Sequence, residues 1–338
     1  MTQTNPVDII SDELPEDTVD TVVIGGGAAG LNGALMLARS RRSVVVVDAG
    51  DPRNAPADAV HGAIGLDGTP PAELLRRGRE DVRRYGGLVV AGTVVDAAPL
   101  PPAADGDLGF RVRLADGRAV TARRLLVATG LRDVLPEVPG LAEHWGHHVV
   151  HCPYCHGWEV RDETIGVIAT GPMSVHQALL FRQLTDDVVY FSRGIDLDDP
   201  DRARLAARGV RVVEAPVSEV LRADDGGIAG VRLADGDVIE RRVLAVGTTL
   251  QARTEGLEAL GLATEEVPPG IGTRFVSGLA GATDVPGVWV AGNATDLTAQ
   301  VGAAAAAGAL AGARINADLV IAEADAAVVA TDTVGSVA

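Results

Sequence analysis

The sequence predicts an α/β fold made of two similar domains. The segment "DTVVIGGGAAGLNGALMLARSRRSVVVVDAG" has the pattern of a strand, a glycine-rich turn, a helix and a second, buried strand. The same order of elements returns in "ETIGVIATGPMSVHQALLFRQLTDDVVYFSRG", and the hexapeptide "VRLADG" occurs at residues 112–117 and again at 231–236. Units of this kind build parallel sheets, so we expect two Rossmann-like dinucleotide-binding domains.

Composition and charge exclude several classes of protein. The 338 residues, 47% of them hydrophobic, are enough for two domains with their own cores. All 29 basic residues are arginine and the net charge is −17, which argues against nucleic-acid binding and removes lysine-based chemistry. No apolar run approaches the roughly 20 residues that span a bilayer, and the acidic N-terminus has no signal-peptide pattern. We therefore expect a cytoplasmic protein that does not bind membranes.

The first glycine-rich turn has the pattern of a dinucleotide site. Gly25, Gly27 and Gly30 form G-x-G-x-x-G between the strand and the helix, and Asp48 ends the next strand. The glycines allow a tight turn, a close approach of backbone to a pyrophosphate and close helix packing. The carboxylate can accept a hydrogen bond from a ribose hydroxyl, so the whole unit indicates a bound dinucleotide.

The remaining elements follow in order. The loop "DPRNAPADAVHG" precedes "PPAELLRRGREDVRRYG", which predicts a helix with Pro71 near its start. Alternating apolar residues around Asp116-Gly117 predict a hairpin, and a similar one recurs at 231–236. "GVWVAGNATD" predicts a buried strand that runs into a Gly-Asn loop, and "LTAQVGAAAAAGALAGARINADLVIAEA" predicts a long packed helix. Residues 1–18 are expected to be a disordered acidic tail, and residues 321–338 a flexible one.

The two cysteines of the chain, Cys152 and Cys155, stand together in "VVHCPYCHGWEV". They could form a disulfide staple, half of a zinc site or a redox centre. A disulfide that closes so short a loop removes little unfolded-state entropy, which disfavours the staple. Spacing alone leaves a Cys2His2 zinc site open, because five of the seven histidines lie nearby: His144, His147, His148, His151 and His156.

Four markers, in this order, resemble the low-molecular-weight thioredoxin reductases, which are flavoproteins with two dinucleotide domains. They are "GGGAAG", "ATG" at 128–130, C-x-x-C before the second turn, and "AGN" at 291–293. The resemblance covers about residues 19–320 and implies three-layer ββα domains and a homodimer. It also implies a split FAD domain at 19–132 plus 250–320, with an NAD(P)H-binding-like domain that carries the cysteines at 133–249.

The resemblance implies FAD on the "GGGAAG" turn, with Asp48 on its ribose and the following loop facing the isoalloxazine. Asn293 stands where the family has an aspartate near the ribityl and phosphate groups, so a hydrogen-bonding side chain remains but its charge is lost. The helix that begins near Gln300 would direct its positive end at the flavin N1–C2 edge. The implied FAD-binding residues are Gly25, Gly27, Ala28, Gly30, Asp48, Arg53, Asn54, His61, Thr129, Gly130, Gly292, Asn293, Gln300 and Val301.

The resemblance also implies that Cys152 and Cys155 are a redox pair that exchanges electrons with FAD, and that no metal is bound, since a closed zinc site would silence the thiols. His156 stands where thioredoxin reductases carry an acid/base aspartate, and an ordinary pKa near 6.5 suits a group that deprotonates a thiol. The Cys-x-x-Cys-His pattern also resembles FAD-dependent dithiol oxidases, which close disulfides in small sulfur-containing natural products.

The second turn leaves NADPH binding uncertain. Ala169, Gly171 and Ser174 take the three glycine positions, and Arg193 is followed by four aspartates that would repel a 2′-phosphate. We therefore expect oxidation of a dithiol substrate, either a small molecule or a thioredoxin-like protein, with oxygen as the acceptor. The alternatives are an NADPH-dependent reductase of thioredoxin or a thioredoxin-like protein and, from other classes, a non-catalytic flavin redox sensor or a zinc-binding module.

Overall fold

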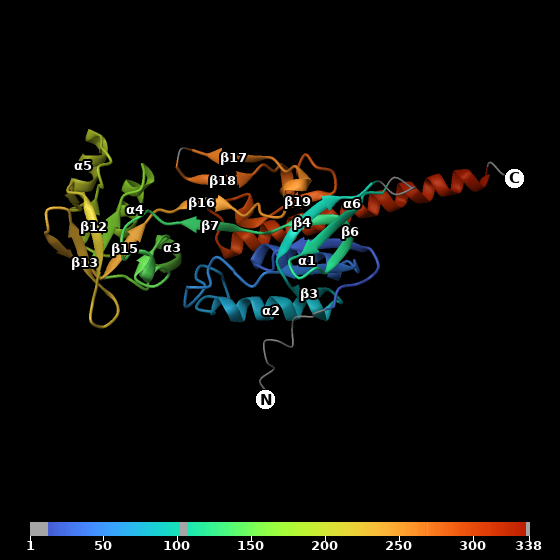
Figure 1. Ribbon diagram of the computed structural model, residues 1–338, viewed down its shortest axis with the longest axis horizontal. Coiled ribbons are helices and arrows are strands. Elements are labelled where there is room, and N and C mark those ends of the chain that lie inside the picture. The colour runs from blue at the N-terminus through green and yellow to red at the C-terminus, as the bar shows by residue number, and fades with distance from the viewer. Residues whose placement is uncertain (1–12, 102–106, 269, 336–338) are drawn as a thin grey trace, which may run out of the picture. The chain divides into compact units, whose positions relative to one another are not determined.

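The computed structural model describes residues 13–101, 107–268 and 270–335. The chain divides into two compact units (Figure 1). Unit 1 takes the chain up to Ala55, then Pro71–Arg132 and the part from Gln251 onward, whereas unit 2 takes Pro56–Pro70 and Asp133–Leu250. The chain divides after residues 132 and 250, and the loop 56–70 belongs to unit 2. The identity of the units as FAD-binding and NAD(P)H-binding-like domains stays a prediction. Of the expected N-terminal tail, residues 1–12 lie outside the described residues, and residues 13–18 form neither helix nor strand.

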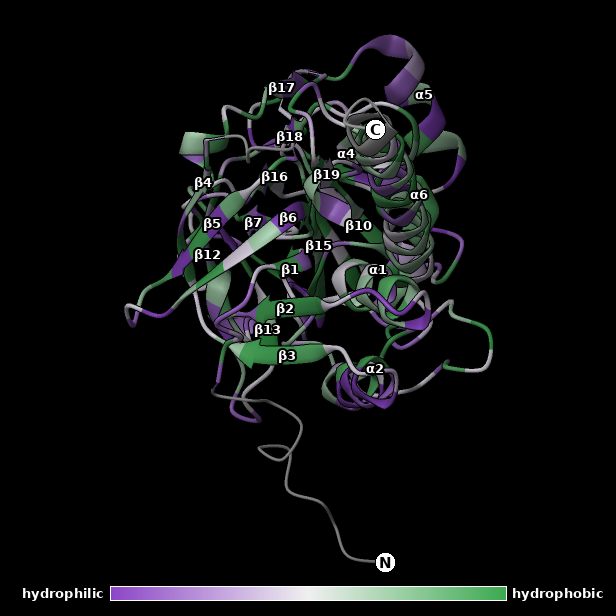
Figure 2. Cartoon of the chain, turned by 90° about the vertical axis from the view of Figure 1, so that its right-hand side faces the viewer, coloured by the Kyte–Doolittle hydropathy of each residue, from purple (hydrophilic) through white to green (hydrophobic). Residues whose placement is uncertain are grey.

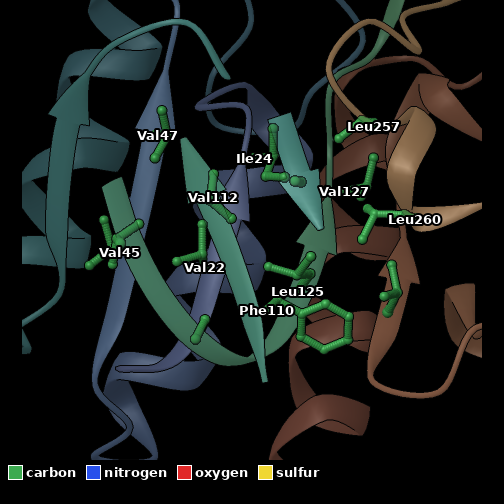
Figure 3. Close-up of a cluster of buried hydrophobic side chains, with 14 of the residues drawn as sticks. Val22, Ile24, Val45, Val47, Phe110, Val112, Leu125, Val127, Leu257 and Leu260 are labelled. Carbon is green, nitrogen blue, oxygen red and sulfur yellow. The ribbon is translucent and has the colours of Figure 1, made fainter. Parts of the chain in front are cut away.

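Unit 1 is built on a seven-stranded sheet of β1 (Val19–Ile24), β2 (Val44–Asp48), β3 (Leu88–Ala91), β4 (Val94–Pro99), β5 (Phe110–Leu114), β6 (Ala119–Val127) and β19 (Val288–Val290). The order β3-β2-β1-β6 is parallel, and β19 also pairs with β6 in parallel. The predicted hairpin at Asp116-Gly117 joins β5 to β6. One face of this sheet forms a core with Val22, Val45, Val112 and Leu125, to which Leu257 and Leu260 are added from later in the chain (Figure 3).

The helices of unit 1 are α1 (Ala28–Arg39), α2 (Pro71–Arg84) and α6 (Val301–Gly335). Figure 2 shows α1 and α6 side by side. The two backbones approach closely because α6 has glycines where it meets α1. A Cβ on Gly308 would lie 1.9 Å from the carbonyl oxygen of Ala29, and a Cβ on Gly312 would lie 2.5 Å from that of Gly33. The small-residue run of the sequence is therefore a helix-packing surface.

The length of α6 corrects two expectations. A flexible tail was expected from residue 321, but the helix continues to Gly335, because this alanine-rich stretch carries no glycine or proline before that residue and alanine is the strongest helix former. No segment able to span a bilayer was expected, whereas Val301–Thr331 is long and apolar enough to do so by length and composition alone. Ala304, Ala311 and Ile315 are nevertheless buried in unit 1, as in the core helix of a globular unit.

Unit 2 contains a five-stranded parallel sheet in the order β11-β10-β9-β15-β8 and a three-stranded antiparallel sheet, β12-β13-β14. The hairpin between β13 and β14 is the second one that the repeated hexapeptide predicted. The bounds are β8 (Val149–Val150), β9 (Ile165–Ile168), β10 (Val188–Phe191), β11 (Arg211–Val213), β12 (Val217–Arg222), β13 (Ile228–Leu233), β14 (Val238–Glu240), β15 (Val243–Val246), α3 (Pro153–His156), α4 (Met173–Phe181) and α5 (Asp199–Ala207).

The two division points lie within strands of a separate four-stranded sheet, which has the order β17-β18-β16-β7. These strands are β7 (Leu131–Val134), β16 (Thr249–Ala252), β17 (Thr264–Val267) and β18 (Gly272–Phe275). Short 3-10 turns complete the described elements at Ala142–His144, Glu258–Leu260, Leu279–Gly281 and Gly292–Ala294. Both units therefore have the strand–turn–helix–strand architecture that the sequence predicted.

Candidate active site

The two cysteines lie on a single helical turn of unit 2. The backbone of Cys152 is extended (φ −104°, ψ 120°), and its carbonyl accepts the N–H groups of Cys155 at 3.2 Å and His156 at 3.1 Å. Pro153, at the first helical position, has the φ of a helix and needs no donor there. The turn brings the Cys155 thiol to 2.7 Å from the Cys152 sulfur. A two-electron exchange between dithiol and disulfide is therefore possible with little rearrangement.

Two side chains hold the backbone that precedes this turn. The Nδ1 atom of His151 lies 3.1 Å from the carbonyl oxygen of Val246 on β15. Gln177 on α4 is buried, and its Nε2 donates to the carbonyl of His151 at 2.7 Å. His151 thus serves as an anchor, and among the described residues no group of three or more His, Cys, Asp or Glu side chains is arranged to hold a metal. Nothing in the sequence singled out Gln177, because its role depends on a hydrogen bond to His151, which follows β8 and lies far from Gln177 in the chain.

His156 ends the helix that carries both cysteines. Burial lowers the pKa of its imidazole below the ordinary value; the charge of Glu159 acts against this shift and that of His61 adds to it. Its Nε2 is buried without a hydrogen-bond partner among the residues that the structure describes. A neutral ring with an available nitrogen, next in sequence to a redox thiol, can accept a proton at neutral pH.

His61 lies in unit 2 together with the redox turn. Its Nε2 is 3.3 Å from Glu159 Oε1, and its Nδ1 is 3.5 Å from Asp67 Oδ1. The three loop residues expected to contact the flavin are therefore not grouped within one unit, since Arg53 and Asn54 belong to unit 1. Sequence reasoning missed Glu159, and the one signal for it was a carboxylate three positions after His156.

The first glycine turn has a backbone geometry that would suit the predicted phosphate cradle. Gly25 has φ +110°, and a Cβ there would lie 2.3 Å from the carbonyl oxygen of Ala128. A Cβ on Gly30 would lie 1.8 Å from the carbonyl oxygen of Gly25. Gly27 precedes α1 without a side-chain cap, and a Cβ on it would meet no atom within 4 Å. Open space next to the N–H groups of Ala28 and the first turn of the helix fits the pyrophosphate of FAD.

Asp48 at the end of β2 is buried and held by two donors. Its Oδ1 accepts the N–H of Gly50 at 3.0 Å, and its Oδ2 accepts from Arg79 Nη2 on α2 at 2.7 Å. A Cβ on Gly26 would lie 2.4 Å from the Asp48 carboxylate, so this carboxylate lies directly beside the glycine turn. The sequence did not distinguish Arg79, because α2 carries several other arginines.

The loop before α6 explains why an asparagine replaces the aspartate of the family. The Nδ2 atom of Asn293 donates to the carbonyls of Asp296 at 3.0 Å and Ala299 at 2.9 Å. An ionised carboxylate has no proton to donate and could not make these bonds. The side chain thus fixes the loop that leads to Gln300 and to Val301, the first residue of α6.

The other expected flavin residues lie in unit 1 as well. Thr129 Oγ1 donates to the carbonyl of Arg253 at 2.9 Å, and the carbonyl of Gly130 accepts the N–H of Arg253 at 3.2 Å. Gly292 has φ +73°, and a Cβ on it would lie 2.7 Å from that of Ala29 at the start of α1. The segments 128–130 and 291–293 therefore lie in the same unit as the first glycine turn.

In the second turn, between β9 and α4, one side chain accepts hydrogen bonds from the backbone of the turn itself. Ser174 Oγ accepts the N–H groups of Thr170 at 2.9 Å and Gly171 at 3.4 Å. Pro172 caps α4 and has no N–H to offer. Arg193 donates to the carbonyl of Ala169 at 3.2 Å. Two N–H groups of the second turn are thus engaged and a third is missing at Pro172, although a Cβ on Gly171 would meet no atom within 4 Å, as at Gly27.

The chain is similar to known proteins of one family over most of its length. A family model described as pyridine nucleotide-disulphide oxidoreductase matches residues 19–309. Thioredoxin reductase tcpT of Claviceps purpurea (strain 20.1) is 35% identical over 81% of this chain and 86% of its own length, and thioredoxin reductase sirT of Leptosphaeria maculans is 31% identical over 88% and 93%. The crystal structure of HlmI covers 97% of this chain and 100% of its own, with a TM-score of 0.88 and 42% identity. An oxidoreductase from Agrobacterium tumefaciens covers 90% and 99%, with a TM-score of 0.81 and 37% identity.

Proposed function

The chain belongs to the pyridine nucleotide-disulphide oxidoreductase family, and on that basis we propose that it oxidises a small dithiol to a disulfide with oxygen as the electron acceptor. It is a flavin-dependent disulfide oxidoreductase with a thioredoxin reductase-like fold, so the predicted fold class, enzyme class and flavin cofactor are confirmed. The dithiol substrate and the use of oxygen are the parts that we propose.

FAD would be held by the glycine turn at Gly25, Gly27 and Gly30, with the carboxylate of Asp48 beside its ribose. The open space at Gly27 and the uncapped start of α1 support this position. When bound, FAD supplies a two-electron acceptor that molecular oxygen can reoxidise.

His156 and the cysteine pair perform the thiol chemistry. His156 accepts the proton of a substrate thiol, and the thiolate attacks one sulfur of the oxidised Cys152–Cys155 pair. The second substrate thiol then displaces that cysteine, so two substrate S–H bonds are replaced by one S–S bond and the cysteines become thiols. Over the full cycle, two electrons and two protons pass from the dithiol to oxygen, which gives hydrogen peroxide.

We favour an oxidase over an NADPH-dependent reductase because of the second turn, where backbone N–H groups already donate to a side chain. Ser174 occupies two backbone N–H groups that a pyrophosphate would need, and Pro172 removes a third possible donor. The aspartates that follow Arg193 add charge repulsion against a 2′-phosphate. Reduction by NADPH is the second candidate, because tcpT and sirT carry the name thioredoxin reductase.

An anaerobic titration of the flavin-loaded protein tests the direction. A small aliphatic dithiol should bleach the flavin absorbance stoichiometrically, and NADPH should do so slowly or not at all. Fast, stoichiometric bleaching by NADPH would overturn the oxidase proposal and favour the reductase. In air, hydrogen peroxide should form in a 1:1 ratio with the disulfide, as the electron balance requires.

The assembly and location remain proposals of ours that rest on the resemblance to thioredoxin reductases: a homodimer in the cytoplasm. Light scattering on the flavin-loaded protein measures the assembly directly, and a mass of a single 34.7 kDa chain would contradict it.

A further inference from the structure

One side of α6 is attached to unit 1. Ala311, Ile315 and Leu319 on that side are buried. Arg124 Nε on β6 donates to Asp318 Oδ2 at 2.5 Å. These contacts fix the rotation of α6 about its own axis, so they also determine which side chains point away from the unit.

The opposite side of α6 is apolar and exposed. Its large side chains are Leu310, Ile321 and Val328, which are 51%, 61% and 60% exposed. Figure 1 shows the last turns of α6 extending beyond the other elements of unit 1, and every residue from Glu323 to Thr331 is exposed. A contiguous exposed apolar surface ordinarily marks a contact with another molecule.

The exposed residues of this side have the spacing of a coiled-coil seam. They recur at alternating intervals of four and three residues, which keeps them on one face of a helix. We call these residues the α6 seam: Leu310, Arg314, Ala317, Ile321, Ala324, Val328 and Thr331. All of them are exposed. A seam of this kind packs against a second helix of matching pattern.

The α6 seam is complementary to itself when two copies run antiparallel and are centred on Leu319. Near the centre a large side chain would then meet a small one, because Ile321 of one copy faces Ala317 of the other. Two-fold symmetry repeats this contact with the copies exchanged. Farther out, Leu310 would face Val328 of the second copy. The sizes of the facing side chains are thus matched, as close packing of helices requires.

Charge favours the same antiparallel order. Arg314 would face the small Ala324 of the second copy and lie next to its Asp325. Both Arg314 and Asp325 are exposed, and among the described residues neither has an ion-pair partner. Symmetry would form this ion pair twice. In the parallel order, Arg314 would instead face Arg314 of the second copy, and like charges so placed repel each other.

A second copy fits this surface better than a lipid bilayer does. α6 is long and apolar enough to cross a membrane by length and composition alone. Its middle, however, carries Arg314, Asp318, Glu323 and Asp325, and charged side chains are costly to bury in lipid. The net charge of −17 also opposes contact with anionic lipid headgroups.

We propose that two copies of this chain dimerise through the α6 seam, with the two helices antiparallel and Arg314 paired with Asp325 of the second copy. The inference rests on the homodimer proposed above and adds the surface that forms it. It does not depend on the direction of electron flow at the cysteines.

Ala317→Glu tests the α6 seam in the flavin-loaded, full-length protein. It places a charge against Ile321 of the second copy at two symmetric positions, so the dissociation constant of the dimer should rise by roughly 100-fold or more. Ala326→Glu is the matched control, because it makes the same substitution at an exposed residue of α6 on the side opposite the seam. It should leave the dissociation constant unchanged. Light scattering over a dilution series measures both variants against the mass of one chain, 34.7 kDa.

A charge swap tests the antiparallel order and does not depend on the first variant. Arg314→Asp should bring two carboxylates together at each end of the interface and raise the dissociation constant by roughly 10-fold or more. Adding Asp325→Arg to the same chain should restore the wild-type value, because the ion pair is then rebuilt with its charges exchanged. A double variant that dissociates as readily as Arg314→Asp would overturn the antiparallel order.

The outcomes distinguish this inference from the proposals on which it rests. A wild-type dimer that neither Ala317→Glu nor Arg314→Asp weakens would overturn the α6 seam and leave the homodimer standing. A wild type with the mass of one chain would overturn both. If that single chain also co-sediments with vesicles of phosphatidylcholine and phosphatidylglycerol, the apolar side of α6 binds lipid instead. The anaerobic titration with a dithiol tests the oxidase chemistry separately.

Discussion

Burial determines the chemistry of His156 at the residue scale. Its pKa is below the ordinary value of 6.5, so the ring is neutral at pH 7 and can accept a proton. The two sulfurs, 2.7 Å apart on the same turn, are the groups that such a base can serve. Substitutions of the cysteines and of His156 test these roles separately.

Cys152→Ser or Cys155→Ser should leave flavin bound and abolish dithiol turnover, because the glycine cradle belongs to unit 1 and the cysteines to unit 2. Flavin absorbance of the purified variants and oxygen consumption with a dithiol measure the two effects. Undiminished turnover in both single variants would show that the pair is not the redox centre.

His156→Ala should reduce turnover by roughly 10²–10⁴-fold, the usual effect of a general base. In the wild type, activity should fall with decreasing pH through the folded pKa of His156, so the midpoint of the acidic limb should lie below 6.5. Because the unfolded chain binds this proton more readily, the contribution of His156 to stability is full above 6.5 and decreases as the pH falls below it. A variant with the wild-type rate and an unchanged limb would make His156 structural.

At the scale of elements, the crossing of α1 and α6 positions the start of α1, which follows the first glycine turn. Gly308 and Gly312 allow this crossing because the α1 backbone occupies the space of their side chains. Closer to the C-terminus of α6, Glu323 forms ion pairs with Arg42 and Arg123. Hydrogen bonds from these two arginines lower the pKa of Glu323 to about 2.

Gly308→Ala should destabilise the protein by about 1–3 kcal/mol or more, since its Cβ would lie 1.9 Å from a rigid backbone oxygen. Gly302→Ala is the control in the same helix, because a Cβ there meets no atom within 4 Å, and it should be neutral or stabilising by up to about 1 kcal/mol. Denaturant unfolding of both variants measures the difference. If Gly308→Ala and Gly302→Ala had the same free energy of unfolding, α1 and α6 would be able to move apart without loss of stability.

At the scale of the whole molecule, each unit has its own sheet and core, and the two predicted sites belong to different units. Apart from His61, the residues predicted to bind flavin belong to unit 1, whereas the cysteines and His156 belong to unit 2. A change that blocks one site should therefore leave the other folded.

Gly30→Ala provides that test. Its Cβ would lie 1.8 Å from the carbonyl oxygen of Gly25, which deforms the cradle, so flavin content should drop strongly. The two cysteines should still react with a thiol reagent at the wild-type rate in the native protein. Loss of both flavin and native thiol reactivity would mean that the two units do not fold independently.

The sequence by itself determined the fold class, the glycine cradle and the cysteine pair. Each depends on residues that are close in sequence: Gly25, Gly27 and Gly30 in one turn, and Cys152 and Cys155 on another. Local backbone geometry fixes such arrangements, and a periodic apolar pattern reports the strands and helices around them.

Only the tertiary structure decided which distant side chains meet these local sites. It placed His61 against Glu159 in unit 2, Arg79 on Asp48, and Gln177 on the backbone before Cys152. These contacts join residues far apart in the chain, and they depend on how packed elements orient their side chains. No local pattern encodes that orientation, because it results from burial and close packing of the complete unit.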